Sequence, residues 1–212
     1  MKKTKDNQNL RVEILSATEN LFIQHGYSAV TYSQIAKEVG ISKSLLQYYF
    51  PKKSLLLEQI MYANFNQWIA SIPVEETYAK LATFLMMFFK FISQNPQIHK
   101  FIIEIIENNE LFDIFINYFQ KWLTKHDLLT GNQSKIRSAL LFALSGGLQL
   151  YRFKDNLKLP INRITSTIMT SFLSMLDVPA SLIKNTLTIA TDTFDQLSST
   201  TWEFTTDFKQ AD

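Results

Sequence analysis

One short segment, residues 31–50, constrains the fold of this chain more than any other. Thr31 and Gln34 have the T-x-x-Q spacing of a capping box, which marks the start of a helix. Gly40 stands where that helix has to end, because a residue without a Cβ adopts positive φ without strain. Ser42 then provides the N-cap of a second short helix. The segment therefore predicts two short helices joined by a tight turn, which is the helix-turn-helix layout.

Both predicted helices have one apolar side on which they can pack. The apolar side of the first helix consists of Ile35, Ala36 and Val39, and that of the second of Leu46, Tyr49 and Phe50. The opposite face of the second helix is polar and carries Lys43, Ser44, Gln47 and Tyr48. Hydrogen-bonding side chains of these kinds suit the base edges and phosphates of DNA.

With the helix before it, this segment resembles the N-terminal domain of TetR-family transcriptional repressors. The matching residues are Ala17, Leu21, Phe22, Gly26 and Tyr27, then Thr31, Ile35, Ala36, Gly40, Ile41, Ser42 and Lys43, then Leu46, Tyr49, Phe50, Lys53 and Leu56. The resemblance implies a repressor that binds a palindromic operator as a homodimer and is released by a ligand. It implies a DNA-binding surface of Thr31, Ser33, Ser42, Lys43, Ser44, Gln47, Tyr48, Tyr49 and Lys53.

One position departs from the family pattern, which usually has an aromatic residue where this chain has Gln47. Glutamine can bond an adenine edge through two hydrogen bonds, which tyrosine cannot do, so the base preference is not carried over from relatives. Tyr48 and Tyr49 point about 100° apart on a helix, so one faces the core and the other faces outward. We assign Tyr49 to a phosphate on the resemblance, with packing as the alternative. For the whole segment the alternative is a helical pair used only for packing.

Composition and charge agree with a small regulator. The chain has 212 residues, 46% of them hydrophobic, and no cysteine, which excludes disulfides and thiolate metal sites. No apolar run resembles a signal peptide or a membrane span, so we expect a cytoplasmic protein. Residues 1–60 hold eight Lys/Arg against five Asp/Glu, a balance of +3, and the remainder has a balance of −1. Lys2, Lys3, Lys5 and Arg11 form a basic N-terminal stretch that can meet DNA or simply be solvated.

Beyond Phe50 the sequence predicts helices throughout, and hence an all-α fold. We expect a helix-turn-helix DNA-binding domain at 1–53, a connecting helix at 54–72, and a helical ligand-binding and dimerisation domain at 73–212. Within the last, helices are predicted at 75–94, 97–107, 110–125, 133–153 and 161–176, with another opened by Pro179. The apolar residues 84–89 mark a helix surrounded by others. Trp202, Phe204 and Phe208 lie in a polar tail whose role stays open.

The helices near 133–153 and 161–176 are expected to form the dimer. Their apolar stripes are Ile136, Leu140, Ala143, Gly147 and Tyr151 in the first, and Ile161, Ile164, Ile168, Phe172 and Met175 in the second. The pair Gly146-Gly147 costs about 1 kcal/mol per glycine inside a helix, which close approach of another helix would offset. TetR-like proteins dimerise through a corresponding late helix pair. The alternative is ordinary core within one chain.

A ligand is implied by the resemblance more than by particular residues. An apolar or amphipathic effector in the second half would contact an aromatic pocket with polar groups such as His99 or Glu104. The candidates are Trp68, Phe84, Phe88, Phe91, Phe101, Glu104, Tyr118 and Trp122. The competing interpretation is that aromatic residues at helical spacing are plain core.

An enzyme is not expected, and neither is a cofactor or a metal. The chain lacks a glycine-rich phosphate loop, a G-x-S-x-G elbow and an H-E-x-x-H motif. Its histidines, His25, His99 and His126, are far apart, and His25 suits the C-terminal end of a helix. The alternative function is a helical apolar-ligand carrier or protein-interaction module with a non-functional helix-turn-helix.

Overall fold

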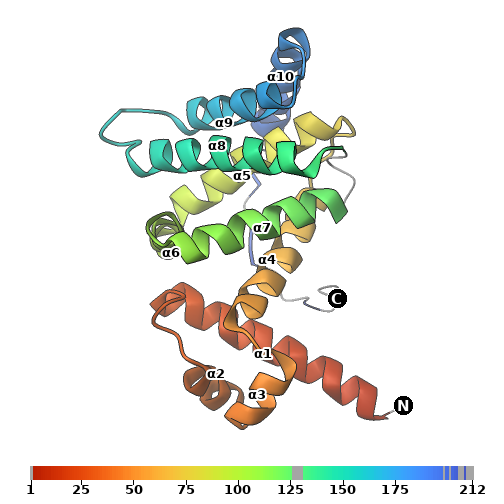
Figure 1. Ribbon diagram of the computed structural model, residues 1–212, viewed down its shortest axis with the longest axis vertical. Helices are drawn as coiled ribbons and strands as arrows, with labels where there is room; N and C mark the ends of the chain where they lie inside the picture. The colour runs from red at the N-terminus through yellow and green to blue at the C-terminus, as the bar shows by residue number, and fades with distance from the viewer. Residues whose placement is uncertain (1, 126–130, 198, 201, 205–207, 209–212) are drawn as a thin grey trace. The chain divides into compact units, whose positions relative to one another are not determined.

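The computed structural model describes residues 2–125, 131–197, 199–200, 202–204 and 208 (Figure 1). Their regular elements are helices, which confirms the predicted all-α fold: α1 (Lys2–His25), α2 (Tyr32–Val39), α3 (Lys43–Tyr49), α4 (Lys53–Ala70), α5 (Thr77–Gln94), α6 (Pro96–Glu107), α7 (Asn109–Lys125), α8 (Gln133–Arg152), α9 (Ile161–Met175) and α10 (Ala180–Gln196). None of the described helices has the length and apolar character needed to cross a membrane. His126 and the side chains of Lys2, Lys3 and Lys5 lie outside the described part.

The chain divides into two compact units. The first unit comprises Met1–Gln67, Gln97–Glu104 and Glu203–Asp212, and the second comprises Trp68–Pro96 and Ile105–Trp202. This grouping differs from the limits expected at residues 53 and 72, because the boundary between the units falls inside α4, between Gln67 and Trp68, and most of α6 belongs with the first unit. Distant parts of the chain therefore contribute to the unit that contains α2 and α3.

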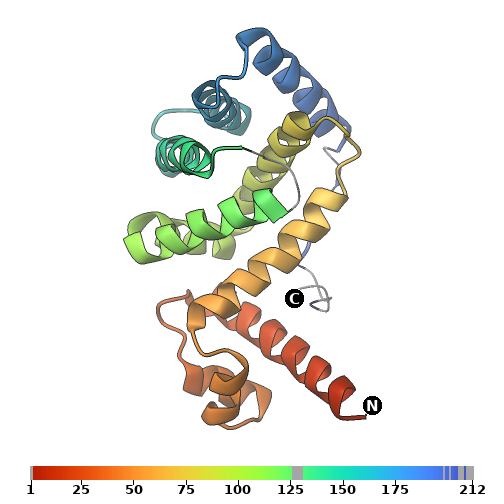
Figure 2. The same cartoon turned by 45° about the vertical axis from the view of Figure 1, so that its right-hand side comes forward.

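In the first unit, α2 packs against both α1 and α3 (Figure 2). The apolar core of this unit is buried and consists largely of Ile14, Leu15, Phe22, Val30, Ile35, Ala36, Leu46, Phe50 and Leu56. The hydroxyl of Tyr32, at the start of α2, donates to the carbonyl of Phe50 at 2.8 Å. Because Phe50 follows the last residue of α3, this bond joins the beginning of α2 to the end of α3.

In the second unit, α5 lies at the centre. Its residues 84–89 are buried all round, which confirms the prediction of a helix surrounded by others. Both α9 and α10 pack against α5, and α8 lies along α9. Figure 2 shows α8 and α9 side by side and nearly end-on.

The contact between α8 and α9 corrects the interpretation of Gly147. A Cβ added to Gly147 would lie 2.1 Å from Cγ1 of Ile168 in the same chain. The α8 stripe around Gly147 is buried in the chain, as are Ile164, Ile168 and Phe172 of α9, while Ile161 and Met175 are half-buried. Gly147 therefore permits close packing of two helices within one subunit, and the stripe assigned to the dimer is core instead. The outward face of α8 is a different one, with Phe142 and Gly146 exposed.

Candidate nucleic-acid interface

The first helix of the helix-turn-helix begins as predicted. The N–H of Gln34 donates to Oγ1 of Thr31 at 3.3 Å, and the N–H of Thr31 donates to Oε1 of Gln34 at 2.8 Å, so the capping box is confirmed. These reciprocal bonds satisfy two donors that the end of a helix otherwise leaves without partners. They fix the start of α2.

The turn and the second cap also follow the prediction. Gly40 has φ of 76°, in the left-handed region that favours glycine, and ends α2. Ser42 accepts a hydrogen bond from the N–H of Leu45 at 3.1 Å, and this starts α3. The local sequence therefore sets both ends of α2 and the start of α3.

The side chains of α3 divide into a buried base and a polar outer face. Leu46 and Phe50 are buried and anchor the helix. The outer face, hereafter the α3 face, consists of the exposed side chains Ser42, Lys43, Ser44, Gln47 and Tyr48, and Tyr48 is 78% exposed. It offers amide and hydroxyl groups that can donate and accept, together with an ammonium group that can only donate. This is the chemistry needed to bond base edges and phosphate oxygens.

Three other predicted DNA-binding residues, Thr31, Ser33 and Tyr49, differ in their exposure. Thr31 and Ser33, at the start of α2, are both exposed, but the Thr31 hydroxyl already takes part in the capping box. Tyr49 is half-buried, and its ring meets that of Tyr48 edge-on at 5.6 Å between centroids. Tyr49 is thus the tyrosine that turns toward the core, and Tyr48 is the one that faces outward.

Lys53 is placed differently from the sequence-based expectation. Its ammonium group donates to the backbone carbonyls of Tyr27 at 2.8 Å and of Val30 at 2.9 Å. It also lies 4.2 Å from the centre of the Tyr27 ring. Two of its three N–H donors are therefore directed at the loop between α1 and α2, which nothing in the local sequence reveals.

Arg11 also has partners within the first unit. Its guanidinium donates to Oε1 of Gln59 at 2.9 Å and lies 5.0 Å from the centre of the Phe50 ring. The prediction grouped Arg11 with the solvated or DNA-contacting basic residues, but the structure gives it a role in joining α1 to α4. The reason is tertiary, because Gln59 is 48 residues away in sequence.

Further along α1 and α4, Glu19 and Asn64 form a buried polar pair. Nδ2 of Asn64 donates to a carboxyl oxygen of Glu19 at 2.7 Å. Burial raises the pKa of Glu19 from 4.5 to about 7, and the hydrogen bond from Asn64 opposes that rise. The carboxyl group therefore titrates near neutral pH in the folded protein.

Glu104, proposed as a ligand handle, bonds the loop between α1 and α2 in the first unit. Its two carboxyl oxygens accept from the N–H groups of Tyr27 at 2.9 Å and Ser28 at 2.8 Å. Together with Phe101 it lines a cavity of about 240 Å³ whose other walls are residues 22–26, Gln97 and Lys100. The sequence carried no signal for this partner, because Glu104 and Tyr27 are 77 residues apart.

The other six predicted ligand residues belong to the second unit, whereas Phe101 and Glu104 belong to the first. All six are buried: Trp68, Phe84, Phe88, Phe91, Tyr118 and Trp122. Ring centroids lie 4.9 Å apart for Trp68 and Phe91, 6.2 Å for Phe84 and Phe88, and 5.4 Å for Phe84 and Trp122. The rings fill the space between them by contacting one another, which is core packing.

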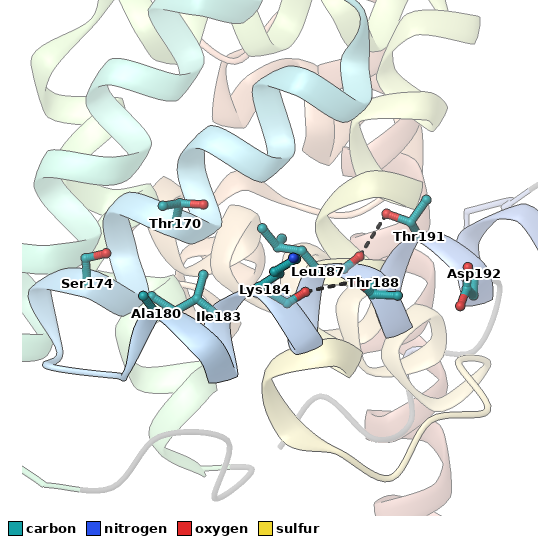
Figure 3. Close-up of a pocket in the computed structure, with 9 residues that line it drawn as sticks. All are labelled: Thr170, Ser174, Ala180, Ile183, Lys184, Leu187, Thr188, Thr191 and Asp192. Carbon is teal, nitrogen blue, oxygen red and sulfur yellow. Dashed lines mark hydrogen bonds between the residues drawn. The ribbon is translucent and has the colours of Figure 1, made fainter.

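A more open cavity lies between α9 and α10 (Figure 3). It measures about 560 Å³ and is lined by Thr170, Ser174, Ala180, Ile183, Lys184, Leu187, Thr188, Thr191 and Asp192. Two of its threonine hydroxyls bond backbone carbonyls of their own helix, Thr188 to Lys184 at 3.1 Å and Thr191 to Leu187 at 2.8 Å. None of the predicted ligand residues belongs to this groove.

Comparison with known proteins agrees with this geometry. Residues 14–60 match the family model described as "Bacterial regulatory proteins, tetR family". The chain is 37% identical over 70 residues to the HTH-type transcriptional regulator RutR of Escherichia coli K12, an alignment that covers 32% of this chain and 33% of RutR. The chain thus spans about a third of the length of that relative.

Two further relatives are similar over most of their length. The HTH-type transcriptional regulator PksA of Bacillus subtilis is 26% identical over 187 residues, which cover 80% of this chain and 91% of PksA. The crystal structure of a TetR transcriptional regulator from Rhodococcus sp. RHA1 has the same fold, with a TM-score of 0.56 at 16% identity over 81% of this chain and 97% of that one. The α2-turn-α3 geometry and the matched segment together lead to one assignment: residues 14–60 form a helix-turn-helix domain of the TetR family of transcriptional regulators.

Proposed function

We propose that the chain binds a palindromic DNA operator as a homodimer through the α3 face, and that it acts in the cytoplasm as a repressor released by a small apolar or amphipathic effector. The α3 face carries this proposal. Its five exposed polar side chains stand on a helix anchored by Leu46 and Phe50 and capped at a defined residue, Ser42. A short recognition helix held rigidly in this way suits the major groove.

The distribution of charge also favours DNA binding at the N-terminal end of the chain. Residues 1–60 have a balance of +3, and Lys43 and Lys52 are exposed at either end of α3. Cationic side chains beside a recognition helix attract the phosphate backbone and make affinity depend on salt. We assign Lys43 to a phosphate in preference to Lys53, whose ammonium group has internal acceptors.

The dimer is proposed to form through the outward faces of α8 and α9. On α8, Phe142 is 64% exposed, and Ser145, Gly146 and Gln149 are exposed beside it. A large exposed aromatic ring next to small residues is typical of a surface that a partner covers. One recognition helix per subunit then meets one half-site in each half of a two-fold operator.

The effector proposal rests on the aromatic cluster of the second unit. A pocket for an apolar molecule needs walls of this kind, and here the walls are rings that already contact one another. An effector must therefore either displace a ring or enter a conformation in which the rings have moved apart.

A gel-shift titration with the DNA upstream of the chain's own coding sequence tests the proposed function, with salt varied from about 50 to 200 mM. Specific retention that weakens steeply with salt is expected. Absence of retention at any salt concentration contradicts the proposal and favours the helical carrier or protein-interaction module.

Gln47→Ala tests base recognition within that experiment. If Gln47 bonds a base edge with two hydrogen bonds, its loss should cost about 1–3 kcal/mol at one base pair per half-site. Selection from a randomised operator library measures the preference at each position. Gln196→Ala, at an exposed position on α10, is the matched control and should leave the preference unchanged. An unaltered preference for Gln47→Ala would remove the residue from base recognition.

A further inference from the structure

Trp202 lies outside the helices, and its side chain is nevertheless 6% exposed. Its ring is stacked on that of Trp68 of α4, with centroids 4.9 Å apart and an angle of 7° between the planes. Its centroid is also 5.6 Å from that of Phe84 of α5. Two helices therefore form an aromatic site, and a residue from a non-helical segment fills it.

The site also has a polar edge. Nε1 of Trp202 donates to Oγ of Ser71 at 3.3 Å. The Ser71 hydroxyl itself donates to the carbonyl of Trp68 at 2.7 Å, which leaves its lone pairs for an incoming N–H. Ser71 is an exposed residue, so this edge of the site is open to water.

These contacts have the composition of a small-molecule site. Such sites are mostly apolar and aromatic, and a few placed polar groups set the orientation of the ligand. Here one parallel ring, one tilted ring and one hydroxyl acceptor all engage a single planar group. Trp202 lies outside the helices and Glu203, next in sequence, is exposed, so the indole does not enter the site as part of a packed helix.

We propose that the indole of Trp202 is an internal occupant of the effector site, and that the effector is a planar aromatic heterocycle with one hydrogen-bond donor that takes its place. The walls belong to α4 and α5, whose backbone hydrogen bonds are made within each helix, so they persist when the indole leaves. Free ligand has to compete with Trp202, so its apparent affinity is the intrinsic affinity multiplied by the fraction of molecules in which the site is empty.

The position of Trp202 in the chain connects occupancy to regulation, a step that rests on the proposed function. Trp202 is the last residue of the second unit, and the chain then continues into Glu203–Asp212 of the first unit, the unit that contains α3. The stacked Trp68 is likewise the residue at which α4 passes from the first unit into the second. Suppose that operator binding favours the conformation in which Trp202 fills the site. By linkage, a ligand that binds better to the conformation with Trp202 displaced must then bind less tightly when the operator is present.

Indole itself is the probe, and Trp202→Ala in the full chain is the principal variant. Truncation to alanine opens a space of the shape of indole, and apolar cavities of that kind bind aromatic molecules. Indole should raise the melting temperature of Trp202→Ala in a saturable manner and should bind it at least tenfold more tightly than it binds the unaltered protein. No shift up to the solubility limit of indole overturns the proposal.

The hydroxyl acceptor is tested with 1-methylindole, which has no N–H. It should bind Trp202→Ala about two- to tenfold more weakly than indole, as expected for one lost hydrogen bond. In the double variant with Ser71→Ala the two ligands should bind equally. A difference that survives Ser71→Ala contradicts the assigned orientation.

If Trp202→Ala does not fold, the unaltered protein labelled with 5-fluorotryptophan provides the test. Its three tryptophans yield three fluorine resonances, and the one lost in Trp202→Phe belongs to Trp202. Saturating indole should move the Trp202 resonance to a solvent-exposed position, and an unmoved resonance overturns the proposal. These readouts involve no DNA. Indole binding without operator binding therefore refutes only the regulator, and operator binding without indole binding refutes only this site.

Discussion

At the scale of single residues, Lys53 and Glu104 both bond the loop between α1 and α2, Lys53 as a hydrogen-bond donor and Glu104 as an acceptor. Lys53 donates to the carbonyls of Tyr27 and Val30, and Glu104 accepts from the N–H groups of Tyr27 and Ser28. Each bond involves a charged group, and such bonds contribute more than neutral ones. Both residues therefore stabilise the start of the helix-turn-helix before any DNA is bound.

Lys53→Met should therefore lower stability. Losing a charged donor to two carbonyls is expected to cost about 1.5–3 kcal/mol, seen as a lower midpoint in urea unfolding. Lys43→Met is the matched variant, because Lys43 is exposed on the α3 face. It should leave the midpoint unchanged, weaken all operator sequences alike and reduce the salt slope by about one per subunit. If instead Lys53→Met keeps full stability and loses DNA affinity, Lys53 acts on phosphate as the resemblance implied.

Glu19 predicts a dependence of stability on pH. Its folded pKa of about 7 lies above the ordinary 4.5, so between these values the folded protein binds more protons than the unfolded chain. The contribution of Glu19 to the free energy of unfolding is then fully present below pH 4.5 and is lost as the pH rises through about 7, a change of about 3 kcal/mol in total. Glu19→Gln keeps an oxygen for Asn64 and removes the titration. The difference between the urea midpoints at pH 5 and pH 8 should be smaller for Glu19→Gln than for the unaltered protein. If the midpoint changes with pH equally in both proteins, Glu19 titrates normally.

At the scale of elements, the two adjacent glycines of α8 have opposite surroundings. A Cβ at Gly147 meets the buried side chain of Ile168 at 2.1 Å, whereas one at Gly146 meets nothing within 4 Å. Gly147→Ala should destabilise the protein by about 1–3 kcal/mol through overpacking, even though alanine is the better helix former. Within the single chain, Gly146→Ala should raise stability by about 1 kcal/mol, since the added Cβ meets nothing there and only the helix propensity changes. Thermal unfolding of both variants should be measured at several protein concentrations. A change in melting temperature that is the same at every concentration arises within the chain, whereas one that varies with concentration arises from association. Equal results for the two variants would show that α8 and α9 are not closely packed at Gly147.

At the scale of the whole molecule, assembly depends on surfaces that remain exposed after each chain has folded. Phe142→Glu places a charge on the outward face of α8 and should yield a folded monomer in sedimentation velocity, with operator affinity reduced at least tenfold. Leu182→Glu makes the same type of change at an exposed position of α10, outside the proposed interface, and should remain dimeric. A Phe142→Glu dimer with normal DNA binding would place the interface elsewhere.

Much of the fold was predictable because its determinants are local. The capping box of Thr31 and Gln34, the positive φ of Gly40 and the cap at Ser42 each depend on residues within a few positions of one another. The unbroken apolar run at 84–89 in α5 likewise indicated burial on all sides. Hydrogen bonds within one helical turn depend on neighbouring residues alone, so they form whatever the rest of the chain packs against that turn.

Only the tertiary structure decided which apolar stripes and charged groups meet. A stripe such as that around Gly147 has the same spacing whether it packs on Ile168 of its own chain or on another subunit, so periodicity could not distinguish the two. The partners of Lys53, Glu104 and Trp202 are 23 to 131 residues away along the chain. The sequence by itself determined where helices start and stop and that one of them presents polar groups outward. Packing determined that Lys53 stabilises a loop and that Trp202 fills an aromatic site. The reason is that the folded chain adopts the long-range pairings that exclude water best, and these have the lowest free energy.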